Sequence, residues 1–190
     1  MNRRVAQPRA VSSLANQRSQ LTEAGQYDLV ESILAYLRTV ELRAPREREG
    51  EVAYTRSDLL PAVQMVLDRS GIRGLVLGGD HTGINRPVSF VGETYTPDII
   101  VQHREQPILA IEVKLLRSGG RTGATSTAIG QAGIYGLERF PYSAVFLIDT
   151  VNKSRSLRAR PPQQQDDKHL AVIIRRKRRQ QLLEGVLLRV

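Results

Sequence analysis

Two apolar segments separated by three polar residues constrain the fold of this chain more than any other feature. Residues 97–103 and 107–115 are rich in isoleucine, valine and leucine, and Arg104, Glu105 and Gln106 lie between them. Segments rich in β-branched residues on either side of so short a polar connection are typical of an antiparallel β-hairpin. Because side chains alternate between the two faces of a strand, each hairpin residue is assigned to one face.

One face of the predicted hairpin collects three charged residues. Glu112 and Lys114 are two positions apart and therefore share a face. If the hairpin is symmetric about Glu105, Asp98 lies directly opposite Glu112, and opposed residues have Cβ atoms roughly 5 Å apart. A register slip of one residue would break this cluster. The other face is predicted to be core and carries Ile99, Val101, Leu109, Ile111 and Val113.

Such a cluster suits a divalent cation. Two neighbouring carboxylates repel each other unless a cation lies between them. Oxygen ligands and water suit Mg²⁺ or Mn²⁺, and bound Mg²⁺ can polarise a phosphodiester and lower the pKa of a water. A lysine beside it can orient or deprotonate that water, or stabilise the transition state. An ordinary solvated Glu–Lys pair is the alternative interpretation of Glu112 and Lys114.

The rest of the chain alternates helical and extended patterns. Helices are expected at 22–43 with Thr22 as its cap, at 57–67, at 126–140 and at 164–183. Strands are expected at 75–77, 87–91, 144–149 and 186–190. This order predicts an α/β fold with a central mixed sheet flanked by helices. Residues 1–20 are expected to be a mobile basic arm, and residues 21–190 one domain with a flexible basic connection around 151–166.

The charge of the chain favours a polyanion as partner. The formal net charge is +9 with a pI near 10.4, and only four of the 28 cationic residues are lysine. Arginine suits bidentate phosphate contacts, although a solubility charge is the alternative reading. No apolar run approaches the roughly 18 residues that a membrane span needs. Without cysteine or a hydrophobic leader, the chain is expected in the cytoplasm.

The PD pair that ends at Asp98 and the IEVK segment around Glu112 resemble the signature of the PD-(D/E)xK (restriction-endonuclease-like) nuclease superfamily. The resemblance spans about residues 22–150 and implies an αβββαβ core. It also implies that Asp98, Glu112 and the backbone carbonyl of Val113 bind the metal, while Lys114 assists the nucleophile.

Two further features extend the resemblance. Gln131 and Tyr135 are four residues apart and share a helical face, which is similar to the QxxxY element of exonuclease-like branches, where the glutamine reaches into the site. A core tyrosine beside a solvated glutamine is the alternative. The resemblance also implies an acid on the first helix. Glu31 is favoured because it lies beside the apolar stripe, with Glu23 and Glu41 as alternatives.

The resemblance predicts a Mg²⁺- or Mn²⁺-dependent endo- or exodeoxyribonuclease, with DNA favoured as substrate and restriction, phage defence or repair as the role. A Holliday-junction resolvase or an RNase effector on the same fold is an alternative, and a non-catalytic nucleic-acid-binding or assembly module is another. With no separate sequence-reading domain in view, specificity would rest on the structure of the nucleic acid, on a homodimer or on a partner protein. The expected nucleic-acid contacts are Arg117, Arg121, Tyr135, Arg175, Arg176 and Arg178.

Overall fold

A computed structural model describes residues 21–78, 87–117, 121–149, 169–176 and 183–189. The predicted basic arm at 1–20 and the connection around 151–166 lie outside these residues. The elements are α2 (Glu23–Thr39), α3 (Glu51–Tyr54), the π-helix η1 (Thr55–Leu59), α4 (Leu60–Ser70), β1 (Gly74–Gly78), β2 (Val88–Phe90), β3 (Glu93–Tyr95), β4 (Ile99–His103), β5 (Gln106–Leu116), α5 (Arg121–Glu138), β6 (Tyr142–Asp149), β7 (His169–Arg176) and β8 (Leu183–Arg189).

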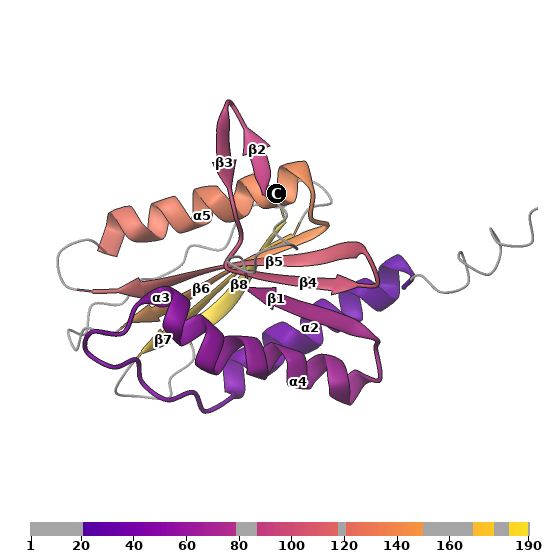
Figure 1. Ribbon diagram of the computed structural model, residues 1–190, viewed down its shortest axis with the longest axis horizontal. Helices are drawn as coiled ribbons and strands as arrows, with labels where there is room; N and C mark the ends of the chain where they lie inside the picture. Colours follow the sequence, from indigo (N-terminus) through magenta and orange to yellow (C-terminus); the bar gives the residue numbers. More distant parts are fainter. Residues whose placement is uncertain (1–20, 79–86, 118–120, 150–168, 177–182, 190) are drawn as a thin grey trace, which may run out of the picture.

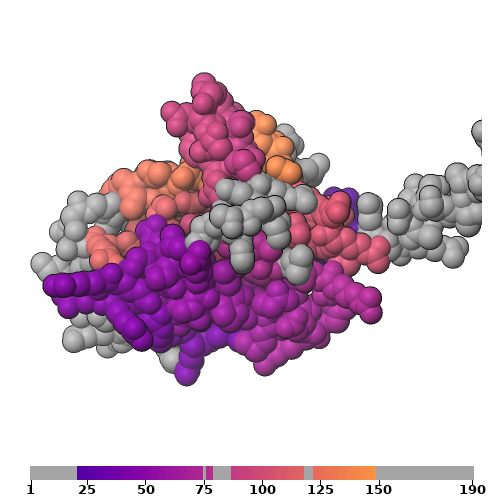
Figure 2. All heavy atoms as spheres, viewed as in Figure 1, coloured from indigo at the N-terminus to yellow at the C-terminus, as the bar shows by residue number. Residues whose placement is uncertain are grey.

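Six strands form one mixed sheet in the order β1-β4-β5-β6-β7-β8. β5, β6 and β7 are parallel, and the remaining pairs are antiparallel. α2 and α4 lie on one side of the sheet and α5 on the other (Figure 1). β2 and β3 form a separate hairpin that projects from the body (Figure 2). The predicted α/β class with a mixed sheet flanked by helices is therefore confirmed.

Strand β5 is buried on both faces, which explains its nearly continuous apolar sequence. On one face, Ile111 and Val113 belong to a cluster with residues of α2 and α4, among them Ile33. On the other, Ala110 belongs to a cluster with Tyr135 and neighbouring residues of α5. Burying one large aliphatic side chain stabilises a fold by about 1.5–3 kcal/mol, so the two helical layers hold β5 firmly at the centre.

The predicted hairpin register holds where it matters for the charged residues. Ile99 pairs with Ile111 and Val101 with Leu109, as symmetry about Glu105 requires. The register shifts by one residue after Val101, so the turn end of the hairpin is not symmetric. This irregularity lies toward the turn and away from Asp98, so the pairing beside the charged cluster is unaffected.

Several predicted element boundaries were displaced. The first helix ends at Thr39, and its predicted cap is confirmed because the Thr22 hydroxyl accepts a hydrogen bond from Gly25 N at 3.2 Å. The second helical segment begins at Glu51 rather than at residue 57, and α5 begins at Arg121. The β3 strand was not predicted.

The predicted helix at 164–183 is wrong. Residues 169–176 form β7, which is parallel to β6 along its whole length. The sequence had the appropriate signal, because residues 170–174 (LAVII) are a short apolar run of the kind found in buried parallel strands. The arginines that follow this run favoured a helical interpretation, and the neighbouring strand overrides that local preference. The last strand, predicted at 186–190, is confirmed as β8, although it begins earlier.

None of the helices in the described part of the chain is long and apolar enough to cross a membrane.

Candidate active site

The site forms beside the first residue of β4, where β5 continues beyond the ladder between the two strands. The ladder between the two strands runs as far as Ile99 and Ile111, whereas β5 extends to Leu116. Beyond the ladder, two carboxylates accept the β5 N–H groups. Asp98 Oδ2 accepts from Val113 N at 2.7 Å, and Glu51 Oε1 accepts from Leu115 N at 3.0 Å. Both N–H groups are thereby satisfied, as buried backbone groups must be.

Glu112 is the most deeply buried of the acids at this place, with 2 % of its surface exposed. Its Oε1 lies 2.9 Å from Lys114 Nζ, and its Oε2 accepts a 2.9 Å hydrogen bond from the Tyr135 hydroxyl. Lys114 Nζ also lies 3.3 Å from Glu51 Oε2. Glu112 is thus held from two sides, and the lysine is held between two carboxylates.

Burial controls the electrostatics of the acids. Burial and the nearby charge of Glu112 raise the pKa of Asp98 to about 7, although the Val113 N–H and Lys114 oppose the rise. Burial likewise raises the pKa of Glu112, against the opposing effects of Lys114 and Tyr135. At neutral pH the two carboxyl groups therefore resist carrying two charges together.

The same surroundings keep the lysine cationic. Burial lowers the pKa of Lys114, but its hydrogen bond to Glu112 and the charges of Glu112, Glu51 and Asp98 outweigh that effect and raise it overall. Burial and the Glu112 carboxylate also raise the pKa of Tyr135, so its hydroxyl keeps its proton and acts as a donor. The site contains a fixed ammonium and a fixed hydroxyl, both directed at Glu112.

These residues fit a magnesium-type cation. Among the described residues, no group of three or more His, Cys, Asp and Glu side chains is arranged to hold a metal. Mg²⁺ does not require such a group, because it binds through one or two carboxylates and retains several waters. Asp98 and Glu112 would supply the carboxylates. Because the N–H of Val113 points toward Asp98, the carbonyl of the same extended residue is expected to face that edge too.

The structure brings together most of the predicted catalytic residues. Asp98, Glu112 and Lys114 converge as described, and Tyr135 reaches Glu112 from α5. Gln131 lies one turn before Tyr135 and has a buried Oε1 without a hydrogen-bond partner in the described structure. An unpartnered buried amide oxygen is costly, and a bound water or ion would satisfy it.

The acid from the helical layer is Glu51. Among the described residues, Glu51 is the helical carboxylate that contacts Lys114 and Leu115, rather than the predicted Glu31 or its alternatives, Glu23 and Glu41. Glu51 therefore replaces Glu31 in the candidate site. A signal for it existed, since Glu51 directly follows Gly50 at a helix N-terminus, where carboxylates are favoured. By sequence alone, the charged run Arg46 to Glu51 indicates only the break between two helices.

The structure corrects one of the predicted nucleic-acid contacts and places most of the others. Tyr135 is fully buried against Glu112 and is not available to contact nucleic acid. Arg117 is exposed and donates to the carbonyl oxygens of Glu47 and Glu49. Arg121 is the first residue of α5. Arg175 and Arg176 end strand β7 rather than lying on a helix, and Arg178 lies outside the described residues.

Two hollows lie beside the cluster and share Val52 in their walls. One has a volume of about 230 Å³ and includes Asp98. The other has a volume of about 660 Å³ and includes Glu51 and Arg117. Each hollow therefore opens onto a carboxylate of the site. Comparison of the chain with protein-family models, with curated proteins and with solved structures finds no match.

Proposed function

We propose that this chain is a Mg²⁺-dependent nuclease of the PD-(D/E)xK type that hydrolyses phosphodiester bonds in DNA. One observation carries the proposal: Asp98, Glu112 and Lys114 meet at one half-buried place, beside the register Ile99–Ile111. A structural ion pair alone would not need the second carboxylate, whose burial beside Glu112 raises its pKa. Buried, mutually repelling acids next to an opening are typical of functional sites.

The arrangement of elements supports the same proposal. A helical segment, the antiparallel strands β1, β4 and β5, helix α5 and the parallel strand β6 come in this order along the chain, with the β2–β3 hairpin inserted between β1 and β4. This order is compatible with the αβββαβ core of a restriction-endonuclease-like fold. The net charge of +9 supports a nucleic acid as the partner.

Each residue has a distinct task in this proposal. Asp98, Glu112 and the Val113 carbonyl would hold the cation, which when bound polarises the phosphodiester and makes a water more acidic. Lys114 is cationic, so it would stabilise the negative charge that develops on the phosphoryl oxygens during in-line attack by water. Tyr135 would position Glu112 through its 2.9 Å hydrogen bond.

Cleavage assays test the proposal directly. The wild-type protein is incubated with linear, circular, single-stranded and branched DNA and with RNA, in Mg²⁺, Mn²⁺ or EDTA. We expect cleavage with Mg²⁺ or Mn²⁺, none in EDTA, and none for folded Asp98→Ala or Glu112→Ala. Asp28→Ala, which changes an exposed acid on α2, is the matched control and should cleave normally. Wild-type turnover in either site variant would refute the assignment, and cleavage of RNA alone would favour the RNase alternative.

A further inference from the structure

Thr55 has a buried hydroxyl with no hydrogen-bond partner in the described structure, although it lies in a helix. Its residue surface is 4 % exposed. Helical serines and threonines usually donate to a carbonyl one turn earlier. In this chain Ser32, Thr39 and Ser57 each donate to the main-chain carbonyl four residues before them. The described structure gives the buried Thr55 hydroxyl no such bond, and a buried hydroxyl without a partner is costly to the fold.

The helix changes its geometry at this residue. Thr55 begins the π-helical turn η1, and the N–H of Leu60 donates to the Thr55 carbonyl five residues earlier. Turns of this kind are rare and occur frequently at functional sites. Thr55 and Arg56 lie four residues after Glu51 and Val52, so the four residues form one face of the helix. Glu51 on that face already contacts Lys114.

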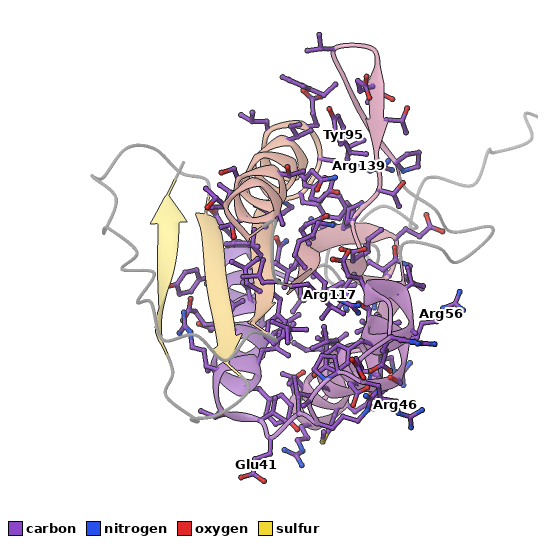
Figure 3. The ribbon with its side chains drawn as sticks, turned by 90° about the vertical axis from the view of Figure 1, so that its left-hand side faces the viewer. Glu41, Arg46, Arg56, Tyr95, Arg117 and Arg139 are labelled. Atoms are coloured by element: carbon purple, nitrogen blue, oxygen red, sulfur yellow. The ribbon has the colours of Figure 1, made fainter. Side chains whose placement is uncertain are left out.

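This helical face forms one wall of the 230 Å³ hollow. Thr55 and Arg56 line it on the helix side, and Thr96 and Asp98 line it from the segment that enters β4. Arg56 projects outward from the helix (Figure 3), so the guanidinium lies toward solvent while the Thr55 hydroxyl is buried. Asp98 connects the hollow to the candidate active site.

We propose that this hollow binds a phosphate group of the nucleic-acid strand next to the phosphate that is cleaved, with Thr55 and Arg56 as donors. This inference rests on the proposed nuclease function. The hollow is smaller than the roughly 300–1,000 Å³ of sites for drug-sized ligands. A hydroxyl and a guanidinium together favour an anion with several acceptor oxygens. The Asp98 carboxylate also lines the hollow and repels an anion, so the phosphate would lie nearer to Thr55 and Arg56.

The second hollow provides a continuation for the same strand. It shares Val52 with the first hollow, and Arg48 and Arg117 line it. Val52 is 51 % exposed. A strand that places one phosphate at Thr55 would cross the Val52 position and meet these arginines. The candidate catalytic residues Glu51 and Asp98 then lie along the path, one in each hollow.

Binding without cleavage tests this phosphate subsite. The affinity of the full chain for a short fluorescein-labelled single-stranded DNA is measured in EDTA over a range of salt concentrations. Thr55→Val removes the hydroxyl and should weaken binding about tenfold, as for a hydrogen bond to a charged acceptor. Thr55→Ser retains the hydroxyl and should bind like the wild type. Arg56→Gln should weaken binding and lower the slope of log K against log salt by about one.

Matched controls are available elsewhere on the chain. Thr39→Val removes a helical hydroxyl on α2, and Arg73→Gln removes an exposed arginine before β1; both should bind like the wild type. Thr55→Val should unfold at the same temperature as the wild type or higher, because the lost hydroxyl has no partner. A purely structural role for Thr55 would lower that temperature.

The outcomes separate the subsite from the nuclease function. Unchanged affinity for both Thr55→Val and Arg56→Gln would overturn the subsite, even if the protein cleaves DNA. Equal losses for Thr55→Ser and Thr55→Val would also overturn it, since the hydroxyl would not be responsible. Weakened binding in a protein that cleaves nothing would support the subsite and refute the nuclease. Absence of measurable wild-type binding would overturn the subsite on its own.

Discussion

Replacing Asp98 by asparagine should stabilise the fold at alkaline pH while abolishing cleavage. Asparagine retains a side-chain oxygen that can accept from Val113 N, but it removes the negative charge beside Glu112. The pKa of Asp98 is raised from 3.8 to about 7 in the folded protein. The folded state therefore binds more protons than the unfolded state between these values, and wild-type stability falls as pH rises through this window.

The raised pKa of Asp98 sets the size of the expected gain in stability. About three pKa units at roughly 1.4 kcal/mol each set an upper limit of about 4 kcal/mol. Asp98 also lines the 230 Å³ hollow, where water screens its charge, so we expect a gain of about 2 kcal/mol for Asp98→Asn at pH 8. Below a pH of about 4 the wild-type carboxyl group is neutral, and the two proteins should be equally stable.

Urea unfolding in EDTA at several pH values measures this difference. The chain has no tryptophan, so far-ultraviolet circular dichroism is the suitable signal. Asp28→Asn on α2 is the control for a change of charge at an exposed position. Mg²⁺ should stabilise the wild type by binding its folded state, and it should not stabilise Asp98→Asn. An Asp98→Asn protein no more stable than the wild type at pH 8 would refute the electrostatic reasoning.

Three further predictions concern the other residues of the site and the charge of the chain. Lys114→Ala should lower the single-turnover cleavage rate about 10²-fold with little change in metal affinity. Gln131→Ala should lower the same rate only about tenfold, because it removes a residue that positions others. An inactive Gln131→Ala protein together with a nearly normal Lys114→Ala protein would contradict these roles. Tyr135→Phe removes the hydroxyl that holds Glu112 and should lower kcat about tenfold, with near-ultraviolet circular dichroism used to check that the core remains packed; a rate equal to that of the wild type would show that Glu112 does not need this support. Affinity for DNA should fall steeply between about 50 and 200 mM salt, and a flat dependence in a fluorescence anisotropy titration would exclude phosphate-dominated binding.

The hairpin was predictable because two independent constraints agree on it. Alternation puts Glu112 and Lys114 on one face, and the short connection around Glu105 restricts the register to few choices. Burial of Ile111 and Val113 then selects one of them, since a slip would turn them out of the core. The register shift after Val101 was not predictable, because one extra residue near the turn leaves the apolar alternation around the site unchanged.

Glu51 and β7 show where local sequence patterns are insufficient. Glu51 enters the site because β5 extends past β4 and leaves Leu115 N to be satisfied, and strand lengths are not encoded in any short motif. Strand β7 depends on pairing with β6, which is distant in the sequence. Both features are decided by tertiary pairing, which a reading of local propensity does not contain.

The part of β5 that extends beyond its ladder with β4 connects the topology of the sheet to the chemistry of the site. A central strand that outlasts its neighbour must find acceptors for its N–H groups, and here carboxylates take that role at Val113 and Leu115. Meeting a backbone requirement in this way brings negative charge to a half-buried place, which raises the pKa of Asp98. Lys114 compensates part of that charge from the same strand. The remainder is what a divalent cation would neutralise, so the place where β4 begins determines where such an ion would bind.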